Sequence, residues 1–244
     1  MNNTPDILQR IVRRKREEIE ERSNRLPLNQ LSRELEAASP ARGFVDAIAS
    51  RLQTGKPAVI AEIKRASPSK GIIREDFRPA DIAVSYHRGG AACLSVLTDV
   101  DFFQGSDTYL QAARAACRLP VLRKDFILDP LQILQARAGG ADAILLIADV
   151  LSVGELSDLM ILATELSLSV LLEVYSAEVL LQVRSLIGFP ETGYSVLGVN
   201  NRDLTTFEVS LDTSRQLAAK LPAAAVKVAE SGISVPAHCR DLAA

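Results

Sequence analysis

The chain has 244 residues, of which 48% are hydrophobic and 24% are charged, and its formal net charge is −2. This near balance argues against a general binder of nucleic acid or acidic membranes, because such proteins need a net basic surface. No apolar run approaches the roughly 18 residues that span a bilayer, and the charged N-terminus does not fit a signal peptide. The three cysteines lack CxxC spacing and fit reduced thiols. We therefore expect a cytoplasmic globular protein with a sizeable core.

The N-terminal segment, residues 5 to about 40, has a helical pattern and is heavily charged. Its mixed basic and acidic run at residues 13–18 is interpreted as a solvated helix face with i,i+4 pairs such as Arg14 with Glu18. A basic binding patch is the weaker alternative, because acidic residues follow the basic ones directly. We expect residues 1–45 to form an N-terminal helical extension.

A different rhythm begins at Pro57, where short runs rich in Val, Ile and Leu recur. These runs are nearly continuously apolar, as expected of parallel strands that are buried on both faces. The average step between them is roughly 28 residues, the size of one βα unit in a (β/α)8 barrel. The seven predicted strands lie within residues 58–64, 92–99, 120–126, 142–148, 169–175, 195–201 and 225–231.

Helical patterns lie between the strands, for instance over residues 107–118 and 130–140. Two helix-to-strand joints repeat, at Gly89–Gly90 and at Gly139–Gly140, and there we expect a glycine in the left-handed conformation that ends a helix. An open doubly wound sheet is the alternative fold. A sheet of that kind that binds dinucleotides would carry G-x-G-x-x-G after its first strand, and this chain has none. The α/β class with a (β/α)8 TIM barrel is therefore predicted.

The barrel prediction meets one difficulty, because a barrel needs eight strands and the sequence offers seven. After the seventh, Ser234 and Pro236 look like the N-cap and first residue of a helix, and the sequence stops within that pattern. We therefore expect one domain in which residues 46–244 form a barrel without its eighth βα unit. The first and seventh strands would then keep unpaired edges.

In such barrels the active residues lie at the C-terminal ends of the strands. Because side chains alternate along a strand, Glu62 and Lys64 share one face of the first strand, as Lys124 and Phe126 do in the third. Burying such charges costs on the order of several kcal/mol each unless they are paired or used by a ligand. The mixture of lysines, an arginine and glutamates suits acid–base chemistry on an anionic substrate. A lysine crowded by other cations would have a lowered pKa and donate its proton near neutral pH.

Two segments have the composition of anion-binding loops. The loop at residues 67–71 and the turn at Ser231–Gly232 offer hydroxyls, a cation and glycine-flanked amides, although an ordinary turn explains the first equally well. His87 and His238 lie in helical patterns away from any strand end. No cluster of His, Cys and Asp has the spacing of metal ligands, so no metal site is predicted.

The strand motifs resemble, in order, those of the indole-3-glycerol phosphate synthase family. The likeness runs from about Ile7 to Ile233 and rests on AEIKRASPSKG, LSVLTDxDFFQGS, LPVLRKDFILDP, ADAILLI, LLEV, GVNNRDLTTFEV and VAESGI. It implies a single (β/α)8 barrel with an N-terminal helical extension over its mouth. It also implies ring closure, decarboxylation and dehydration of 1-(2-carboxyphenylamino)-1-deoxyribulose 5-phosphate to indole-3-glycerol phosphate, in tryptophan biosynthesis, with no cofactor and no metal.

The resemblance also assigns roles to the residues at the strand ends. Lys124 would be the general acid, Glu173 its acid–base partner, and Lys64 the contact of the substrate carboxylate. Glu62 and Glu230 would hold the lysines and stabilise a cationic intermediate. The predicted catalytic residues are Lys124, Glu173, Lys64, Glu62, Glu230 and Asn200, and the predicted substrate-binding residues are Ser67, Phe126, Arg202, Ser231 and Gly232.

Two alternatives stay open at this point. Another phosphate-sugar barrel, such as phosphoribosylanthranilate isomerase, would share the fold and phosphate site but would use a Cys/Asp pair, whereas this chain offers Lys124 with Glu173. An inactive or partner-completed barrel is the other alternative, because the eighth strand is missing. The expected partner is a small phosphorylated substrate, without nucleic acid or membrane. The full-length family is expected to be monomeric, and self-association of this chain through its unpaired edges is the alternative.

Overall fold

The computed structural model describes residues 5–25, 27–203, 206–221 and 225–243. The parallel strands are β1 (Ile60–Ile63), β4 (Cys93–Leu97), β5 (Val121–Lys124), β6 (Ala143–Ile147), β7 (Ser169–Val174), β8 (Ser195–Asn200) and β9 (Lys227–Glu230), and a small ribbon is formed by β2 (Ala66–Ser67) and β3 (Gly71–Ile72). The helices are α1 (Asp6–Arg25), α2 (Leu28–Ala37), α3 (Phe44–Gln53), α4 (Pro79–Arg88), α5 (Asp107–Ala116), α6 (Pro130–Ala138), α7 (Val153–Glu165), α8 (Ala177–Gln182), η1 (Arg184–Leu186, 3-10), α9 (Asp212–Ala218) and α10 (Pro236–Ala243). All seven predicted strands and the predicted α/β class are confirmed.

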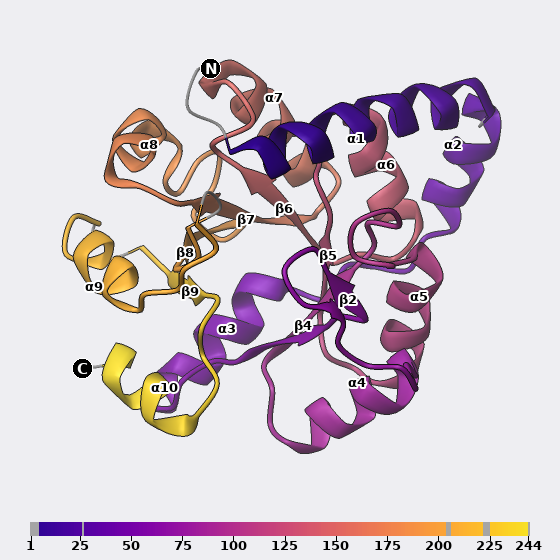
Figure 1. The fold of residues 1–244 in the computed structure, drawn as a ribbon. Coiled ribbons are helices and arrows are strands. Elements are labelled where there is room, and N and C mark those ends of the chain that lie inside the picture. The colour runs from indigo at the N-terminus through magenta and orange to yellow at the C-terminus, as the bar shows by residue number, and fades with distance from the viewer. Residues whose placement is uncertain (1–4, 26, 204–205, 222–224, 244) are drawn as a thin grey trace.

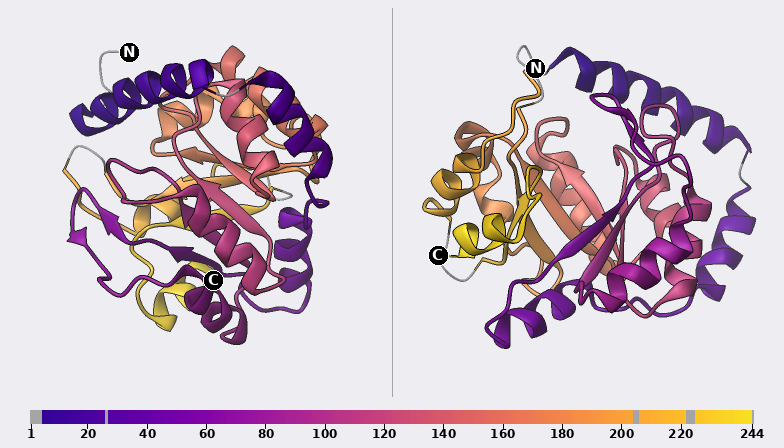
Figure 2. Two further views of the ribbon diagram at one scale, coloured as in Figure 1. Left: turned by 90° about the vertical axis from the view of Figure 1, so that its right-hand side faces the viewer. Right: turned by 60° about the horizontal axis from the view of Figure 1, so that its bottom comes forward.

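The parallel strands form one sheet in chain order, β1-β4-β5-β6-β7-β8-β9. The sheet curls into a half-barrel with helices on its outer face (Figures 1 and 2). Strands β1 and β9 stand at the two ends of this order, and no pairing joins them within the described residues. The short ribbon β2–β3 is antiparallel and lies in the connection that follows β1.

Side-chain alternation explains why the strands read as continuous apolar runs. In β6, Ile144 and Leu146 pack in the layer between the sheet and the helices, whereas Ala143, Leu145 and Ile147 pack inside the curl of the sheet. Both faces of the strand are therefore dry, and polar positions are absent from its middle.

Helix α3 closes the interior of the half-barrel at the end where the strands begin. Its side chains Phe44, Val45 and Ile48 are buried in the same cluster as Leu122 of β5 and Leu171 of β7. This packing leaves the opposite end of the sheet, where the strands terminate, for polar chemistry.

The predicted helix joints are confirmed. Gly90 and Gly140 have φ angles of 82° and 89°, a left-handed conformation that a residue with a Cβ adopts only under strain. The prediction for Ser234 is wrong, because α10 begins at Pro236 and Val235 is therefore the residue in front of it. Among the described helices, none combines the length with the apolar composition that a membrane span requires.

The solvated-face interpretation of residues 13–18 is wrong in one respect. Lys15 is 2% exposed and forms an ion pair with Glu18, because it lies on the face of α1 that also buries Leu8 and Ile11. Arg14 pairs with other residues than the one predicted: Glu17, Glu21 and Asp101. Helix α1 thus turns part of this charged run towards the sheet, across the ends of β4 and β5 (Figures 1 and 2).

Candidate active site

Alternate strands of the sheet bring a layer of charged side chains together at the end where the strands terminate. Lys124 ends β5, Glu173 lies in β7 and Glu230 ends β9, so every second strand contributes one residue. This is the layer geometry of a barrel interior, in which the inward side chains of alternate strands meet. Glu62 of β1 belongs to the same set, because its carboxylate acts electrostatically on Lys124.

Lys124 is held between two carboxylates. Its Nζ lies 3.2 Å from Glu173 Oε2 and forms a second, shorter ion pair with Glu230. The Lys124 side chain is only 17% exposed, so these partners replace water around the ammonium group. Burial by itself lowers the pKa of Lys124, but the carboxylates of Glu230 and Glu173 outweigh it and raise the pKa above its ordinary value. The neighbours of this lysine are therefore acids, so the way in which surrounding cations lower a lysine pKa does not apply to Lys124.

Glu230 is the carboxyl group of this layer that keeps a proton most readily. Burial, followed by the nearby Glu173 carboxylate, raises the pKa of Glu230 to about 8. Its Oε1 is buried and has no hydrogen-bond partner within the described residues. The neighbouring strand makes room for it, because a Cβ at Gly198 would collide with this oxygen. A free carboxyl oxygen next to a lysine is suited to receive a polar group of a ligand.

Tyr175 is a member of the site that the sequence reasoning missed. Its hydroxyl donates a hydrogen bond to Glu173 Oε1, which leaves Oε2 of the same carboxylate for Lys124. Burial and the adjacent Glu173 raise the pKa of Tyr175 well above its ordinary value, so the phenol remains a donor. Tyr175 stands two residues after Glu173. Because side chains alternate between the two faces of a strand, the sequence could have predicted that both point to the interior of the sheet.

The first strand contributes an ion pair and a pocket. Glu62 and Lys64 pair with each other, as their shared face predicted. The phenol of Tyr86, on α4, donates to the Glu62 backbone carbonyl oxygen at 3.2 Å. A pocket beside the pair is lined by Glu62, Ile63, Lys64, Ile73, Arg74, Ile82 and Tyr86. Arg74 adds a cation that the sequence reasoning did not single out.

Asn200 and Arg202, the predicted positioning residues, bind within their own segment. Asn200 Oδ1 accepts from the Arg202 backbone N–H at 3.0 Å, and the Arg202 guanidinium donates to the Phe207 carbonyl oxygen at 3.0 Å. The neighbouring Asn201 is the buried one: its Nδ2 donates to the Glu230 carbonyl oxygen at 2.9 Å and its Oδ1 accepts from Ser214. Asn201 therefore ties β8 to the end of β9 that carries Glu230.

The predicted anion segments lie at the two ends of the sheet order. Ser67 belongs to β2, where its carbonyl oxygen accepts from the backbone N–H of Lys70 at 3.2 Å. Ser231 and Gly232 follow β9 and have φ angles of 65° and 78°. No hydrogen bond or ion pair found in the described part of the chain joins the two segments. Phe126, predicted to line the aromatic pocket, packs against Phe103 with ring centroids 6.1 Å apart.

Asp149, which follows β6, is another residue that the sequence reasoning missed. Its Oδ2 is buried and has no hydrogen-bond partner among the described residues. Burial, followed by the charge of Glu173, raises the pKa of Asp149 from 3.8 to about 6. The position of Asp149 directly after the apolar run 142–148 could have indicated a strand-end acid, but Asp149 belongs to none of the motifs on which the site prediction rested.

We expect Asp149→Asn to stabilise the protein above pH 6. The folded state binds this proton more tightly than the unfolded chain does, so the contribution of Asp149 to stability is full below about pH 4 and is lost as the pH rises through about 6. The gain at pH 7.5 should be about 1–2 kcal/mol, allowing for the exposed part of the carboxylate. Urea unfolding at pH 4 and 7.5 measures it. The exposed Asp158 on α7, changed to Asn, is the control, and a variant that is less stable than the parent at pH 7.5 would contradict the assignment.

Comparisons with known proteins bear on the family and the fold of the chain. The family model described as indole-3-glycerol phosphate synthase matches residues 8–244. Solved structures with a similar fold include the tryptophan synthase a2b2 complex from Pyrococcus furiosus, with a TM-score of 0.52 at 14% identity over 76% of this chain and 83% of that chain. The tryptophan synthase subunit alpha from Legionella pneumophila str. Paris has a TM-score of 0.52 at 16% identity, over 80% of each chain. At these identities the two structures bear on the fold alone.

Curated relatives are much more similar in sequence. An indole-3-glycerol phosphate synthase from Aromatoleum aromaticum (strain DSM 19018 / LMG 30748 / EbN1) is 52% identical over 235 residues, which cover 95% of this chain and 86% of the relative. Another, from Azoarcus sp. (strain BH72), is 55% identical over 234 residues, with the same coverage of 95% and 86%. The chain therefore belongs to the indole-3-glycerol phosphate synthase family.

Proposed function

We propose that this chain converts 1-(2-carboxyphenylamino)-1-deoxyribulose 5-phosphate to indole-3-glycerol phosphate, carbon dioxide and water, as a carboxy-lyase. The observation that carries the proposal is the buried Lys124 between Glu173 and Glu230, at the end of the sheet where barrel enzymes work. The pairing of a lysine with two acids supports this reaction over the phosphoribosylanthranilate isomerase alternative, which would need a Cys/Asp pair.

Lys124 would act as the general acid of ring closure. A bond forms between the ring carbon that bears the carboxylate and the ketone carbon, while the Lys124 ammonium gives a proton to the ketone oxygen. Loss of CO2 and then of that oxygen as water completes the indole. Glu173 and Glu230 hold the ammonium in the free protein, and they would turn towards the cationic nitrogen of the intermediate as it forms. Glu173 would exchange protons with Lys124 in the dehydration.

The other predicted residues would bind the two ends of the substrate. Lys64, oriented by Glu62, would contact the carboxylate, and Phe126 would line the side of the aromatic ring. Asn200 and Arg202 would position the substrate and the catalytic groups. Ser67, Ser231 and Gly232 would receive the phosphate through a hydroxyl or an amide N–H. Residues 46–244 would form the catalytic barrel and residues 1–45 its N-terminal extension, in the cytoplasm, with the phosphorylated substrate as the only small-molecule partner required.

The test is direct turnover of the proposed substrate. The chain contains no tryptophan, so the rise of indole fluorescence on mixing with the carboxyphenylamino-deoxyribulose phosphate has little background. We expect a rise with this substrate and no conversion of phosphoribosylanthranilate in a parallel assay. Conversion of phosphoribosylanthranilate alone would favour the isomerase, and no conversion of either by folded protein would favour a non-catalytic barrel.

A further inference from the structure

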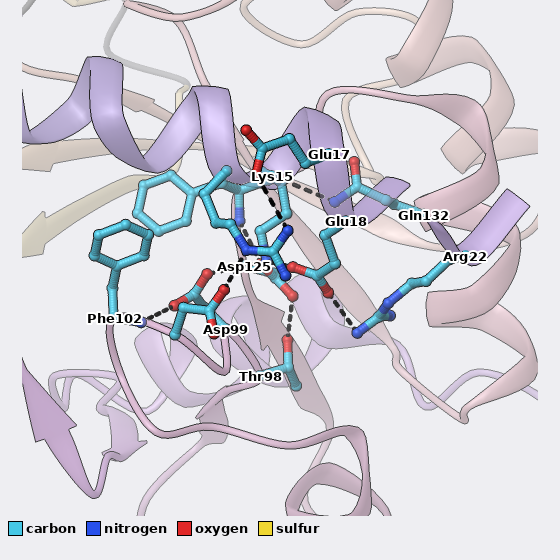
Figure 3. Close-up of polar contacts among 12 residues, drawn as sticks. Lys15, Glu17, Glu18, Arg22, Thr98, Asp99, Phe102, Asp125 and Gln132 are labelled. Atoms are coloured by element: carbon cyan, nitrogen blue, oxygen red, sulfur yellow. Dashed lines mark hydrogen bonds and ion pairs between the residues drawn. The ribbon is translucent and has the colours of Figure 1, made fainter. Parts of the chain in front are cut away.

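Lys15 of α1 is buried among carboxylates outside the catalytic layer. Its Nζ lies 2.7 Å from Glu18 Oε2, 2.9 Å from Asp99 Oδ2 and 2.9 Å from Asp125 Oδ1 (Figure 3). Lys15 and Asp99 are each 2% exposed and Asp125 is 1% exposed as side chains. The three acceptors match the three N–H donors of an ammonium group, so the lysine has no donor left for another partner.

The two aspartates belong to the ends of neighbouring strands. Asp99 follows β4, and its Oδ1 accepts from the backbone N–H of Phe102 at 2.8 Å. Asp125 follows β5 directly after Lys124, and its Oδ1 accepts from the backbone N–H of Phe126 at 2.8 Å. One side chain from α1 therefore joins the two loops that begin where β4 and β5 terminate.

Alternation along the strand separates this cluster from the catalytic layer. Lys124 points inward to Glu173 and Glu230, whereas Arg123 and Asp125 on either side of it face the helices. Asp125 Oδ2 also accepts from the Thr98 hydroxyl at 2.7 Å. The residues before and after the proposed acid are thus fixed from outside, and the backbone at Lys124 has little freedom to turn.

Lys15 and Asp125 both stay charged through the neutral range. Burial opposes ionisation of Asp125, but Lys15 and Arg123 lower its pKa to about 2. Burial likewise acts to lower the pKa of Lys15, and the carboxylates of Asp125, Asp99 and Glu18 raise it above its ordinary value instead. The ion pair of Lys15 with Asp125 is accordingly kept through the neutral range, whereas burial raises the pKa of Asp99 above its ordinary value in spite of Lys15.

We propose that Lys15 is a positioning residue for the reaction proposed above: from α1 it fixes the ends of β4 and β5 and thereby aims Lys124 and Phe126. The inference rests on the proposed function for its effect on turnover. A lysine that only attached α1 to the sheet would affect the stability of the protein and leave the turnover of each folded molecule unchanged. A small misplacement of a catalytic group, by contrast, lowers kcat.

Lys15→Met, which keeps an unbranched apolar side chain and removes the ammonium group, is the variant to measure. We expect kcat to fall at least tenfold and KM to change less than threefold. The amides of Phe102 and Phe126 should lose protection from hydrogen exchange, while those of β7 and β8 keep theirs. Arg14→Gln is the matched control, because Arg14 is the adjacent residue of α1 and its ion pair with Asp101 is partly exposed, at 34% and 44%. The control should keep kcat within twofold.

A second variant separates positioning from folding, because Lys15→Met removes the cation that lies between two buried carboxylates and leaves only Asp125 with another cation, Arg123. The triple variant Lys15→Met/Asp99→Asn/Asp125→Asn has no such charges, and we expect its Tm to exceed that of the single variant while kcat stays at least tenfold low. Recovery of kcat together with Tm would overturn the proposal, as would unchanged amide protection and kcat in folded Lys15→Met. If the parent chain does not turn over the substrate, the proposed function fails. Amide protection then still decides whether Lys15 fixes the strand ends: its loss in Lys15→Met supports the proposal and its retention overturns it.

Discussion

Lys124→Met should lower kcat by about 10²–10⁴, the range that a positioned general acid contributes. The methionine keeps the hydrophobic stem of the lysine and removes a proton donor that both Glu173 and Glu230 bind. The two acids would then face each other without a cation, which favours a shared proton and removes the negative charge proposed to stabilise the intermediate. Both losses act on the chemical step more than on substrate binding, so KM should change much less than kcat.

Indole fluorescence under saturating substrate measures this effect, and circular dichroism checks that the variant is folded. Lys56→Met is the matched control, because Lys56 is an exposed lysine in the segment that leads into β1. It therefore lies at the end of the sheet where the strands begin, away from Lys124. It should retain the kcat of the parent chain. A Lys124→Met protein whose kcat stays within tenfold of the parent would exclude Lys124 as the acid and leave Lys64 as the next candidate.

The five middle strands could be predicted because they are buried on both faces, whereas the edge strands β1 and β9 are only partly buried and were found by their apolar content and spacing. Continuous apolar runs such as residues 142–148 and 169–175 arise only where water is absent from both sides of a strand, and turn residues mark their limits. The same alternation that places Leu122 inside the sheet also predicts the inward direction of Lys124. The central part of the candidate site therefore followed from local pattern combined with barrel topology.

The fate of Lys15 could not be predicted from the charge run alone. A lysine within residues 13–18 is typical of a solvated helix, and its burial depends on two aspartates that lie 84 and 110 positions further along the chain (Asp99 and Asp125). A weak signal was nevertheless present, because Lys15 continues the helical spacing of Leu8 and Ile11 on the buried face of α1. Charge within an apolar stripe indicates a buried partner, and only the tertiary structure shows which one.

Long-range contacts also explain the other differences. The sequence pattern left open which charges surround each lysine, and the nearest neighbours of Lys124 are the acids of β7 and β9. Strand ends that lie far apart in the sequence determine which charges meet, and a list of charged residues does not contain that information. Asn201 is a similar case. The sequence pattern pointed to the adjacent Asn200, but the buried side chain that connects β8 with β9 is that of Asn201.

Asp142→Ala should have the largest effect on stability, a loss of about 3–5 kcal/mol. Asp142 stands just before β6 with a side chain that is 0% exposed, and it pairs with Arg114 of α5, which is 10% exposed. Its carboxylate also accepts from the backbone N–H groups of Arg42 at 2.7 Å and Val121 at 2.8 Å. Alanine leaves a buried guanidinium and two backbone donors without this acceptor, and each unsatisfied group costs about 1–3 kcal/mol.

Urea unfolding measures this loss, and Tm should fall by about 10 °C for a chain of this size. Asp212→Ala is the control, because its ion pair with Arg215 is 65% and 49% exposed and should contribute less than about 1 kcal/mol. Arg114→Met combined with Asp142→Leu should lose less stability than Asp142→Ala, since no buried charge is then left alone. Asp142 lies where β6 begins, at the end of the sheet opposite Lys124, so kcat of the folded variant should equal that of the parent chain. Normal stability of Asp142→Ala would contradict the predicted stability loss and would mean that water replaces the carboxylate. A reduced kcat in the folded variant would contradict the prediction that Asp142 takes no part in catalysis.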